Sequence, residues 1–451
     1  MQLAKIDSSV SAGRIILVSI ISIIVLGAFL LKLPISCTHP ITFFQALFTA
    51  ASSTCVTGLS VVPFHEFTFF GKFILLLLIQ IGGLGFMSFS FFLTWRISGG
   101  LGVADKLMAS EILSFDRIGK MHNFIASIFL ITFSLEIVGA AFLFLKMIKF
   151  FNFWQAVFYS IFYSVSAFCN AGITPNIGGL EIFSKDLLIM STLSLLVFLG
   201  GIGFPVIYEL LEKFLLKFGL SNKKEGTARL SLHSRIVLVS SAVLIVSGAV
   251  ILFLFQNELL INADLSAKTV MSAIFNSISL RSAGFQTCSV STFPKAALFI
   301  SCIFMIIGAS PGSTGGGLKT STFFVIIAGI LATLRGRAQT TIFGRAISNT
   351  QVMKAFSIFV MGIALIFITM TAILITDPTM KFFNIFFEVI SAISTVGIDG
   401  RITQSLSMAG QFVIMIAMIA GRIGSLTFIF AFRKPTSKTS YTLPEERILI
   451  G

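Results

Sequence analysis

Seven long apolar runs constrain this chain more than any other feature. About 20 predominantly apolar residues make a helix that crosses a bilayer, and the runs approach or exceed that length at 14–31, 73–94, 124–145, 187–208, 236–255, 355–375 and 412–432. Because 56% of the residues are hydrophobic and only 11% are charged, the sequence predicts an all-α integral membrane protein. The first run lacks a small-residue cleavage site and is too long for a secretory signal, so we expect it to remain as the first helix.

The basic residues behind the net charge of +14 are distributed unevenly between the two predicted sides of the membrane. If both termini and the segments near 95–122, 209–235 and 319–354 are cytoplasmic, these pieces carry 21 Lys or Arg and 9 Asp or Glu, against 10 and 8 on the opposite side. Such an excess is the positive-inside asymmetry of membrane proteins. It predicts a multi-pass protein of the plasma (inner) membrane with cytoplasmic N- and C-termini, in contact with membrane lipid and without a nucleic-acid partner.

Residue types that carry enzymatic or metal chemistry are few and scattered. The cysteines form no CxxC pair, and the histidines show no metal-ligand spacing; they are Cys37, Cys55, Cys169, Cys288 and Cys302, and His39, His65, His122 and His233. No serine-nucleophile elbow is present either. The sequence therefore predicts neither an enzyme nor an organic cofactor.

A short glycine-containing loop occurs four times along the chain. The four copies read STCVTGLS (53–60), AFCNAGIT (167–174), RSAGFQT (281–287) and STVGIDG (394–400). Their central glycines are Gly58, Gly172, Gly284 and Gly397, separated by 114, 112 and 113 residues. This regular period indicates internal repeats, which we place at 1–120, 121–234, 235–350 and 351–451.

A second glycine-rich signal occurs once in each repeat, within the apolar run that follows the loop. The four copies read QIGGLGF (80–86), LGGIGFP (199–205), GASPGSTGGGLKT (308–320) and GRIGSLTF (421–428). In the first two copies, small residues are expected mainly to let helices pack closely. In the third, Pro311 and five glycines should interrupt the helix. It is not a nucleotide-binding P-loop, because Lys319 is misplaced and no strand precedes it.

Each loop of the first family follows an apolar segment that is too short to span a membrane. Non-helical backbone at membrane depth persists only where protein buries it or water reaches it. Four such re-entrant loops satisfy this condition if they meet at a common axis. Because each repeat begins and ends on the basic side, the repeats are parallel, and the sequence predicts pseudo-fourfold symmetry rather than the inverted repeats of many secondary transporters.

The loop chemistry favours a small monovalent cation. No lysine or aspartate directly precedes a loop glycine, so backbone carbonyl groups are the expected ligands, and these can replace the hydration shell of an alkali ion. Glycine tolerates a positive φ and adds no Cβ at a crowded axis. The C-terminal end of each short helix, which carries roughly half a negative charge, would face the ion.

At these loops the sequence resembles the Trk/Ktr/HKT superfamily of potassium transporters, in particular its KtrB-like membrane subunits. TCVTGLS, NAGIT, SAGFQT and TVGI, with GSTGGGLKT and GRIGSLTF, carry the resemblance along essentially the whole chain. It implies four parallel helix–pore-loop–helix repeats, with eight transmembrane helices and four re-entrant pore helices. The family's potassium filter then falls on Val56, Thr57, Gly58, Asn170, Ala171, Gly172, Ser282, Ala283, Gly284, Thr395, Val396 and Gly397.

The resemblance also assigns a gate. It makes 308–320 an intramembrane gate loop below the filter, formed by Gly312, Ser313, Thr314, Gly315, Gly316, Gly317 and Lys319, although a purely structural kink is the alternative. Arg422 would lie beneath the filter, where its charge sets a barrier to cations. A central arginine is costly in a membrane, so we expect Arg422 to contact a carbonyl of the gate loop.

The resemblance implies potassium uptake through a carbonyl-lined filter, and a sodium ion is a further transported-ion candidate because sodium coupling is a trait of Ktr-type systems. The implied partners are a second copy, forming a homodimer, and a cytosolic ring of nucleotide-binding RCK-type subunits of the KtrA or TrkA kind. The basic segment 335–354 is a docking surface for that ring or a contact with lipid headgroups. The competing class is a secondary transporter that carries a small solute by alternating access.

Three further features are left with open roles. Glu136 lies within an apolar run and is expected to pair inside the helix bundle rather than in the pore. Asp399, two residues after Gly397, adds a charge near the outer mouth. Cys55 and Cys169, each three residues before a loop glycine, are expected to be small packing residues.

Overall fold

The structure is a computed structural model that describes residues 12–85, 88, 121–218, 230–258, 267–287, 293–400, 402–424 and 428. Most of the predicted cytoplasmic segment 95–122, the tail from residue 433 and Cys288 lie outside these ranges.

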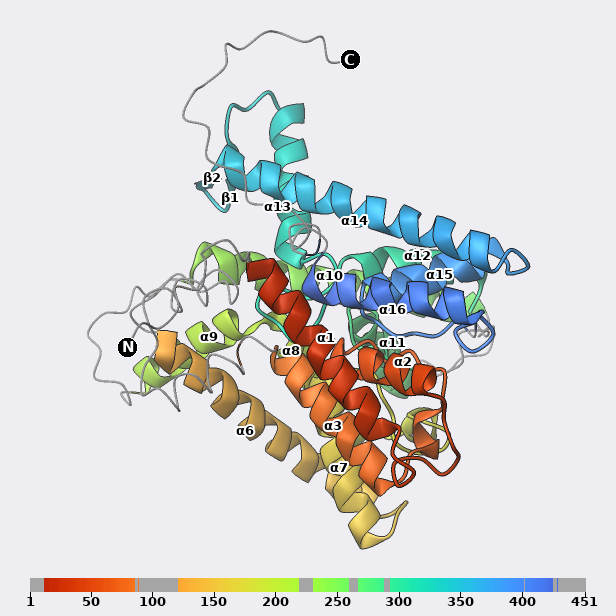
Figure 1. The fold of residues 1–451 in the computed structure, drawn as a ribbon. Helices are drawn as coiled ribbons and strands as arrows, with labels where there is room; N and C mark the ends of the chain where they lie inside the picture. Colours follow the sequence, from red (N-terminus) through yellow and green to blue (C-terminus); the bar gives the residue numbers. More distant parts are fainter. Residues whose placement is uncertain are drawn as a thin grey trace, which may run out of the picture.

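The helices follow one order four times: a long helix, a short helix, a loop and a second helix (Figure 1). The long helices are α1 (Ala12–Leu31), α6 (Met121–Met147), α10 (Leu232–Glu258) and α14 (Asn349–Thr376). The short helices are α2 (Phe43–Thr54), α7 (Phe153–Phe168), α11 (Ala267–Ser279) and α15 (Phe382–Ile393). The second helices are α3 (Phe69–Leu84), α8 (Leu187–Ile202), α12 (Lys295–Ile306) and α16 (Met408–Ile423), with α9 (Phe204–Lys217) after α8 and α13 (Thr320–Leu334) after α12.

Side-chain caps fix where several of these helices begin. Thr42 and Gln45 form a capping box at the start of α2, in which the Gln45 side chain accepts from the Thr42 backbone N–H at 2.8 Å. Such a box satisfies two backbone donors that the first helical turn leaves unpaired. Asp186 and Ser407 cap α8 and α16 through their own side chains. Polar residues at these positions therefore set the helix starts inside apolar sequence.

Length and composition identify only part of the predicted set of spans. Within the described ranges, α6, α14 and residues 232–255 of α10 are each long and apolar enough to cross a membrane alone. The pair α8 and α9 passes the same test together, although it is bent by 103°. The other apolar helices of the described part, such as α3, α12 and α16, are shorter.

Three predicted continuous runs are interrupted, and this corrects the sequence interpretation. The runs 73–94, 187–208 and 412–432 break at Gly85, Gly203 and Gly424, which have φ values of 79°, 100° and 93°. Glycine adopts this left-handed region without steric cost, so it ends a helix inside an apolar run. The glycines of QIGGLGF and LGGIGFP thus do more than pack helices together.

The predicted close packing at the same segments is confirmed. A Cβ on Gly82 would overlap the carbonyl oxygen of Thr54, and one on Gly200 would overlap that of Phe168. Gly421 stands in the same relation to Ile393. In each case the second helix lies against the carboxyl end of the short helix in its own repeat, at a distance that only glycine permits.

The all-α prediction needs one amendment. Strands β1 (Thr340–Ile342) and β2 (Arg345–Ile347) form an antiparallel hairpin in the basic segment between α13 and α14. Its two turn residues, Phe343 and Gly344, have φ values of 50° and 74°, the backbone that two-residue hairpins favour. Hydropathy did not reveal it because the strands are only three residues long.

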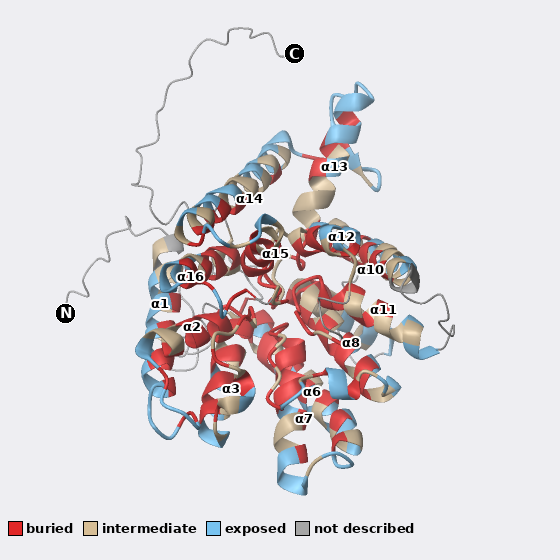
Figure 2. Ribbon diagram, turned by 90° about the vertical axis from the view of Figure 1, so that its right-hand side faces the viewer, coloured by how far each residue is buried: buried red, intermediate tan, exposed pale blue. Residues whose placement is uncertain are grey.

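The helices close into a ring around a buried centre. Each second helix contacts the short helix of the next repeat: α3 contacts α7, α8 contacts α11, α12 contacts α15, and α16 contacts α2. Buried residues gather toward the middle of the molecule, and exposed ones lie at its periphery (Figure 2). One large apolar cluster joins α2, α3, α12, α15 and α16, while a second joins α6, α7, α8 and α11.

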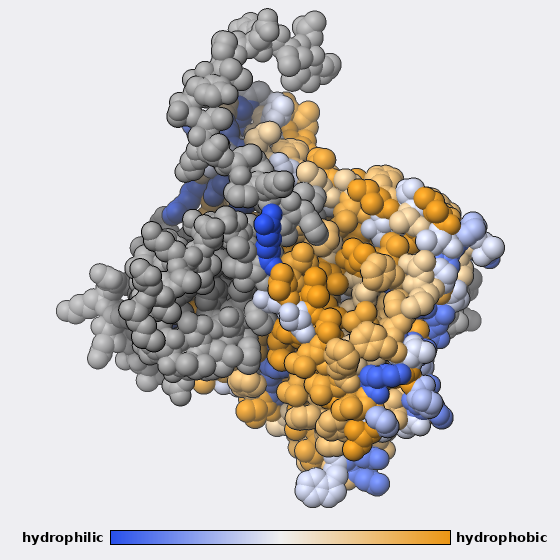
Figure 3. Space-filling model, viewed as in Figure 1, coloured by the Kyte–Doolittle hydropathy of each residue, from blue (hydrophilic) through white to orange (hydrophobic). Residues whose placement is uncertain are grey.

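The outer surface is strongly apolar. Hydrophobic residues cover much of the described face in Figure 3, and hydrophilic residues lie mostly toward its margins. Large side chains on the long helices are more than half exposed, among them Leu130 at 69%, Ile137 at 69% and Phe367 at 64%. An apolar surface of this extent fits contact with lipid hydrocarbon rather than with water.

Candidate functional site: a ring of glycine loops and the loop beneath it

The four glycine loops meet in a closed ring, in the order of the chain. The carbonyl oxygen of Ala171 lies 2.5 Å from where a Cβ of Gly58 would be. In the same way Gly172 faces the Ala283 carbonyl, and Gly284 faces the Val396 carbonyl. Gly397 faces the carbonyl of Thr57, which closes the ring. A side chain at any of these glycines would therefore strike the backbone of the neighbouring loop.

The backbone repeats the same unusual conformation in every loop. The four central glycines have φ values between 64° and 93°. Two residues earlier, a non-glycine residue is also left-handed: Val56 at 55°, Asn170 at 62°, Ser282 at 104° and Thr395 at 49°. A left-handed backbone conformation is rare at residues other than glycine, and it persists only where the surrounding structure imposes it. Strain at four matching positions makes these loops the candidate functional site.

A buried serine holds each loop, and the sequence analysis missed it. The N–H of the residue before each glycine bonds the carbonyl of that serine, as Thr57 does to Ser52 at 2.8 Å and Ala171 to Ser166 at 2.8 Å. The corresponding serines in the other two loops are Ser279 and Ser391. The missed signal is their spacing, since a serine stands five or six residues before every central glycine.

The serine hydroxyls add a second tie in three loops. Ser52 accepts from the Gly58 N–H at 3.1 Å. Ser166 accepts from the Ile173 N–H at 3.0 Å and donates to the Ile173 carbonyl at 2.8 Å. Ser279 donates to the Phe285 carbonyl at 2.7 Å. In the fourth loop, the Ser391 hydroxyl has no hydrogen-bond partner among the described residues.

Further hydroxyls near the ring are buried and lack hydrogen-bond partners within the described part of the chain. They belong to Ser53, Thr54, Thr57 and Thr395. Buried polar atoms are normally paired, so a cluster of unpaired oxygens indicates a place for water or an ion. Carbonyl and hydroxyl oxygens without fixed carboxylates suit a weakly hydrated monovalent cation.

The outer ends of three loops are tied to their short helices at matching positions. The Tyr163 hydroxyl donates to Asn176 at 2.5 Å, and the Thr287 hydroxyl donates to Asn276 at 2.9 Å. Glu388, which is fully buried, accepts from the Gly400 N–H at 2.9 Å and from the Thr403 hydroxyl.

Asp399 lies within this outer network. Its carboxylate accepts from the Thr403 hydroxyl at 3.4 Å, the same hydroxyl that donates to Glu388. The predicted charge near the outer mouth is therefore beside a second carboxyl group, which the sequence analysis did not identify.

The predicted gate loop is held by the break between α8 and α9. The Phe204 N–H, freed by the break, donates to the Gly312 carbonyl at 2.8 Å. In return the carbonyls of Gly200 and Gly201 accept from Thr314 and Ser310 at 3.2 and 3.0 Å. The interruption of α8 at Gly203 thus supplies the backbone groups that anchor the loop 308–319.

The same loop lies directly against three of the four glycine loops. The Asn170 side-chain amide lies 3.1 Å from the Thr314 hydroxyl, and that hydroxyl is 2.9 Å from the Phe168 carbonyl oxygen. The Gly316 N–H donates to the Ser282 hydroxyl at 3.0 Å. A Cβ on Gly316 would strike the side chain of Thr395.

Arg422 joins the gate loop to the first repeat. Its guanidinium donates to the carbonyl of Thr314 and, on the other side, to that of Gly82. A weaker bond reaches Gly83 at 3.3 Å. The expected contact between Arg422 and a carbonyl of the loop 308–319 is therefore present, and among the described residues carbonyl groups receive this half-buried charge.

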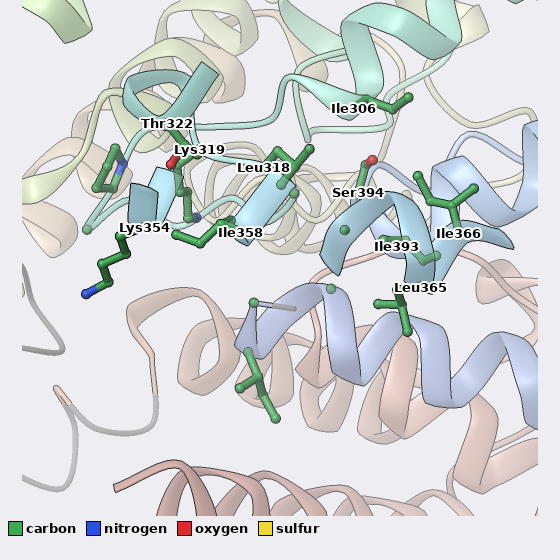
Figure 4. Close-up of a pocket in the computed structure, with 17 residues that line it drawn as sticks. Ile306, Leu318, Lys319, Thr322, Lys354, Ile358, Leu365, Ile366, Ile393 and Ser394 are labelled. Carbon is green, nitrogen blue, oxygen red and sulfur yellow. The ribbon is translucent and has the colours of Figure 1, made fainter. Parts of the chain in front are cut away.

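Two cavities flank the gate loop. One of about 220 Å³ is lined by Gly82, Gly83, Gly312, Lys319 and Arg422, among others. The other, of about 330 Å³, lies between the gate loop and α14 (Figure 4). Lys319 lines both, and its ammonium group donates to the Gly315 carbonyl at 2.7 Å.

Glu136 pairs within the helix bundle, as expected. It is buried on α6 and accepts from the Gln80 amide at 3.2 Å. The Cys169 thiol lies 3.9 Å from its other oxygen. Cys55 and Cys169 are fully buried without a disulfide, as expected of packing residues.

Comparison with known proteins identifies the family. The family model TrkH, described as a cation transport protein, matches residues 7–442. The Ktr system potassium uptake protein B of Bacillus subtilis (strain 168) is 32% identical over 95% of this chain and 94% of its own. The protein of the same name from Vibrio alginolyticus is 33% identical over 97% of this chain and 94% of its own.

A solved structure shares the fold. The potassium transporter TrkH from Vibrio parahaemolyticus superposes with a TM-score of 0.73 at 16% identity, over 96% of this chain and 87% of the other. The family and these relatives are transport proteins and not enzymes.

Proposed function

The chain belongs to the TrkH family of cation transport proteins, and on this premise we propose that it takes up potassium ions across the plasma (inner) membrane through the ring of glycine loops. The named potassium uptake relatives support the choice of ion. The observation that carries the proposal is the closed ring, in which each loop glycine faces a carbonyl of the next loop.

The proposed filter consists of the three residues of each loop that end in its glycine. In each loop the first and third of these residues have a left-handed backbone and the middle one does not, as in Val56, Thr57 and Gly58. This alternation turns successive carbonyl groups toward the same side of an extended chain. Four chains around one axis then provide rings of oxygen ligands for a dehydrated ion, and the short helices direct their negative ends toward it.

The proposed architecture is four parallel repeats with eight spanning helices and cytoplasmic termini. The fourfold order of elements and the cyclic contacts between repeats support it. In this arrangement the glycine loops open to the outside. The loop 308–319 lies on the cytoplasmic side of the filter, where it acts as a gate.

We infer that the contacts of the loop 308–319 keep the proposed gate closed. The loop contacts Asn170, Ser282 and Thr395, the first filter residues of the second, third and fourth repeats. Arg422, which also belongs to the fourth repeat, contacts it as well. A potassium ion leaving the filter would meet this loop and the charge of Arg422. Opening requires the loop to release its bonds to Gly200, Gly201 and Phe204.

Proposed regulation follows from the relatives, whose names place them in a Ktr system. We assign the chain a regulatory partner, in the form of a cytosolic nucleotide-binding ring, and a second copy as a homodimer. The segment 335–354 presents the β1–β2 hairpin with Arg337, Arg345 and Lys354 exposed. It continues into the first turns of α14, which lines the cavity beside the proposed gate.

The direct test is cation uptake into proteoliposomes. The purified chain should take up rubidium, potassium should compete strongly, and sodium and lithium should compete weakly. In Gly284→Ser the added Cβ strikes the Val396 carbonyl, so discrimination against sodium should fall by roughly tenfold, the equivalent of about 1.4 kcal/mol.

Gly344→Ser is the matched control. Gly344 also has a positive φ, but nothing lies within 4 Å of its missing Cβ. Its substitution should leave ion selectivity intact. Unchanged selectivity in Gly284→Ser would refute the filter, and transport of an organic solute without cation uptake would favour an alternating-access mechanism instead.

A further inference from the structure

The third glycine loop differs from the other three at one position. The residue before the first proposed filter residue is Cys55, Cys169 and Ser394 in loops one, two and four. In the third loop it is Arg281, which is only 8% exposed. One repeat therefore carries a full positive charge where the others carry a small neutral side chain.

This charge is poorly neutralised by its surroundings. One guanidinium nitrogen of Arg281 donates to the Ser241 hydroxyl at 3.2 Å, while Nε is buried and has no hydrogen-bond partner in the part of the chain that the structure describes. Neither ion pair recorded there involves Arg281. A buried charge without a carboxylate partner is costly, so its presence calls for a functional reason.

The guanidinium faces the end of a neighbouring helix. A cavity of about 10 Å³ is lined by Arg281, Ser241, Ile278 of α11 and four residues at the end of α8, namely Val197, Phe198, Gly201 and Ile202. That volume is close to the minimum for one water molecule. The carboxyl end of α8 has partial negative charge, which makes the buried cation tolerable without cancelling it.

Arg281 also follows the end of its own short helix by two residues, because α11 ends at Ser279. In the other repeats the negative end of the short helix faces the filter with no cation at this position. In the third repeat, a full positive charge offsets that partial negative charge. The ring carbonyl of Ala283 is only two residues further along the chain, about 7 Å of backbone.

We propose that Arg281 sets the strength of potassium binding in the filter, by repelling the ion from the third repeat so that it is held weakly enough to leave. Conduction requires binding that favours entry without trapping the ion. The inference rests on the proposed function, since it assumes that the ring binds potassium. Arg281 does not contact the ion. It acts through the electrostatic potential that its guanidinium charge creates at the ring.

The test separates the charge from the hydrogen bond. Arg281→Gln and Arg281→Met remove the charge, Arg281→Lys keeps it, and Ser241→Ala removes the hydrogen-bond partner while leaving the charge. The readout is rubidium uptake into proteoliposomes over a range of concentrations, normalised to folded protein. At about 10 Å and an effective dielectric constant of about 25 to 50, between the values for a protein site and for water, a unit charge shifts binding by on the order of three- to tenfold.

The neutral variants should therefore lower KM by about three- to tenfold and lower the maximal rate, because the ion leaves more slowly. Arg281→Lys and Ser241→Ala should keep KM within about twofold of the original. A merely structural role predicts a lower maximal rate with unchanged KM in both neutral variants, and that result would overturn the inference.

The remaining outcomes are also decisive. If Ser241→Ala lowers KM as much as Arg281→Gln, the hydrogen bond rather than the charge is responsible, and the inference is wrong. If neither neutral variant accumulates in membranes, the arginine is structural, which also overturns it. Failure of the unaltered chain to take up rubidium would instead refute the proposed function, so the two failures are distinguishable.

Discussion

Serine supplies the same backbone tie in all four glycine loops, yet its hydroxyl is used unequally. Ser166 bonds both backbone groups of Ile173, whereas the Ser391 hydroxyl has no partner among the described residues. The pair therefore forms a natural comparison within one molecule.

Ser166→Ala should destabilise the protein by about 1–3 kcal/mol, since it leaves a buried N–H and a buried carbonyl of Ile173 without their partner. Thermal unfolding of the detergent-purified protein, followed by fluorescence, measures this directly. Ser391→Ala removes no side-chain hydrogen bond within the described ranges and should unfold near the original temperature. Equal losses in the two variants would show that the hydroxyl contacts do not support the loops.

The loop glycines could be identified from the sequence because their spacing is regular and their chemistry is unusual. The serines obey the same spacing, but serine is common in apolar helices, so its role emerges only when the loop backbone is seen to fold back on it. Asn276, Tyr163 and Glu388 were missed for another reason. They occupy matching positions with different side chains, and no residue-type pattern connects them.

At the scale of helices, close approach between neighbours depends on single glycines. Gly200 and Gly201 are adjacent in α8, but only Gly200 lies against the Phe168 carbonyl. The missing Cβ of Gly201 would be 3.6 Å from the Asn170 amide, an ordinary contact.

Gly200→Ala should therefore force α8 away from α7 and cost about 1–3 kcal/mol, the usual penalty of overpacking. Gly201→Ala should be neutral or slightly stabilising, because alanine favours a helix more than glycine does. Unfolding temperatures and yields of the two variants test the difference. A Gly201→Ala variant as damaged as Gly200→Ala would contradict this account of the packing.

The gate loop offers a similar comparison. Thr314→Val removes the bonds to Phe168 and Asn170, so the loop should be released more readily, and basal rubidium uptake without any regulatory partner should rise several-fold. The Ser313 hydroxyl bonds only within the loop, to the Ser310 carbonyl at 2.5 Å. Ser313→Ala should therefore keep the original basal rate, and an equal rise in both variants would exclude the tie to α7 as the restraint.

The helix breaks show where sequence reasoning reached its limit. Hydropathy indicates which residues prefer lipid, but it does not show whether the helix is continuous across them. The break at Gly203 is stable because Phe204 finds a new acceptor at Gly312, more than 100 residues later in the chain. A partner so distant cannot be read from the local pattern.

On the scale of the whole molecule, the membrane character, the family and the largely helical fold were predictable, since they depend on apolar length and on motifs repeated along the chain. The sequence predicted that the four loops meet at one axis, but it did not predict the closed ring of contacts between them. That ring depends on contacts between repeats, such as those of Gly397 with Thr57, that no spacing specifies.

Orientation is testable on the intact protein. The proposed topology puts Ile177, which is 75% exposed after the second loop, outside the cell, and Ala346 of the β1–β2 hairpin inside. In a Cys288→Ser background, an impermeant maleimide should label Ile177→Cys on whole cells and Ala346→Cys only after permeabilisation. Cys37, Cys55, Cys169 and Cys302 are buried and should give little background, and the reverse labelling pattern would invert the topology.

The order in which the loops meet bears on biosynthesis. The ring runs through the repeats in chain order, and its final junction joins the last loop to the first. A nascent polypeptide that has inserted only its first three repeats lacks the fourth loop, so its ring of loops is open. The proposed ion path is therefore complete only after the last repeat has been synthesised and inserted. Quality control in the membrane thus has most of the period of synthesis to act before the proposed potassium path is complete.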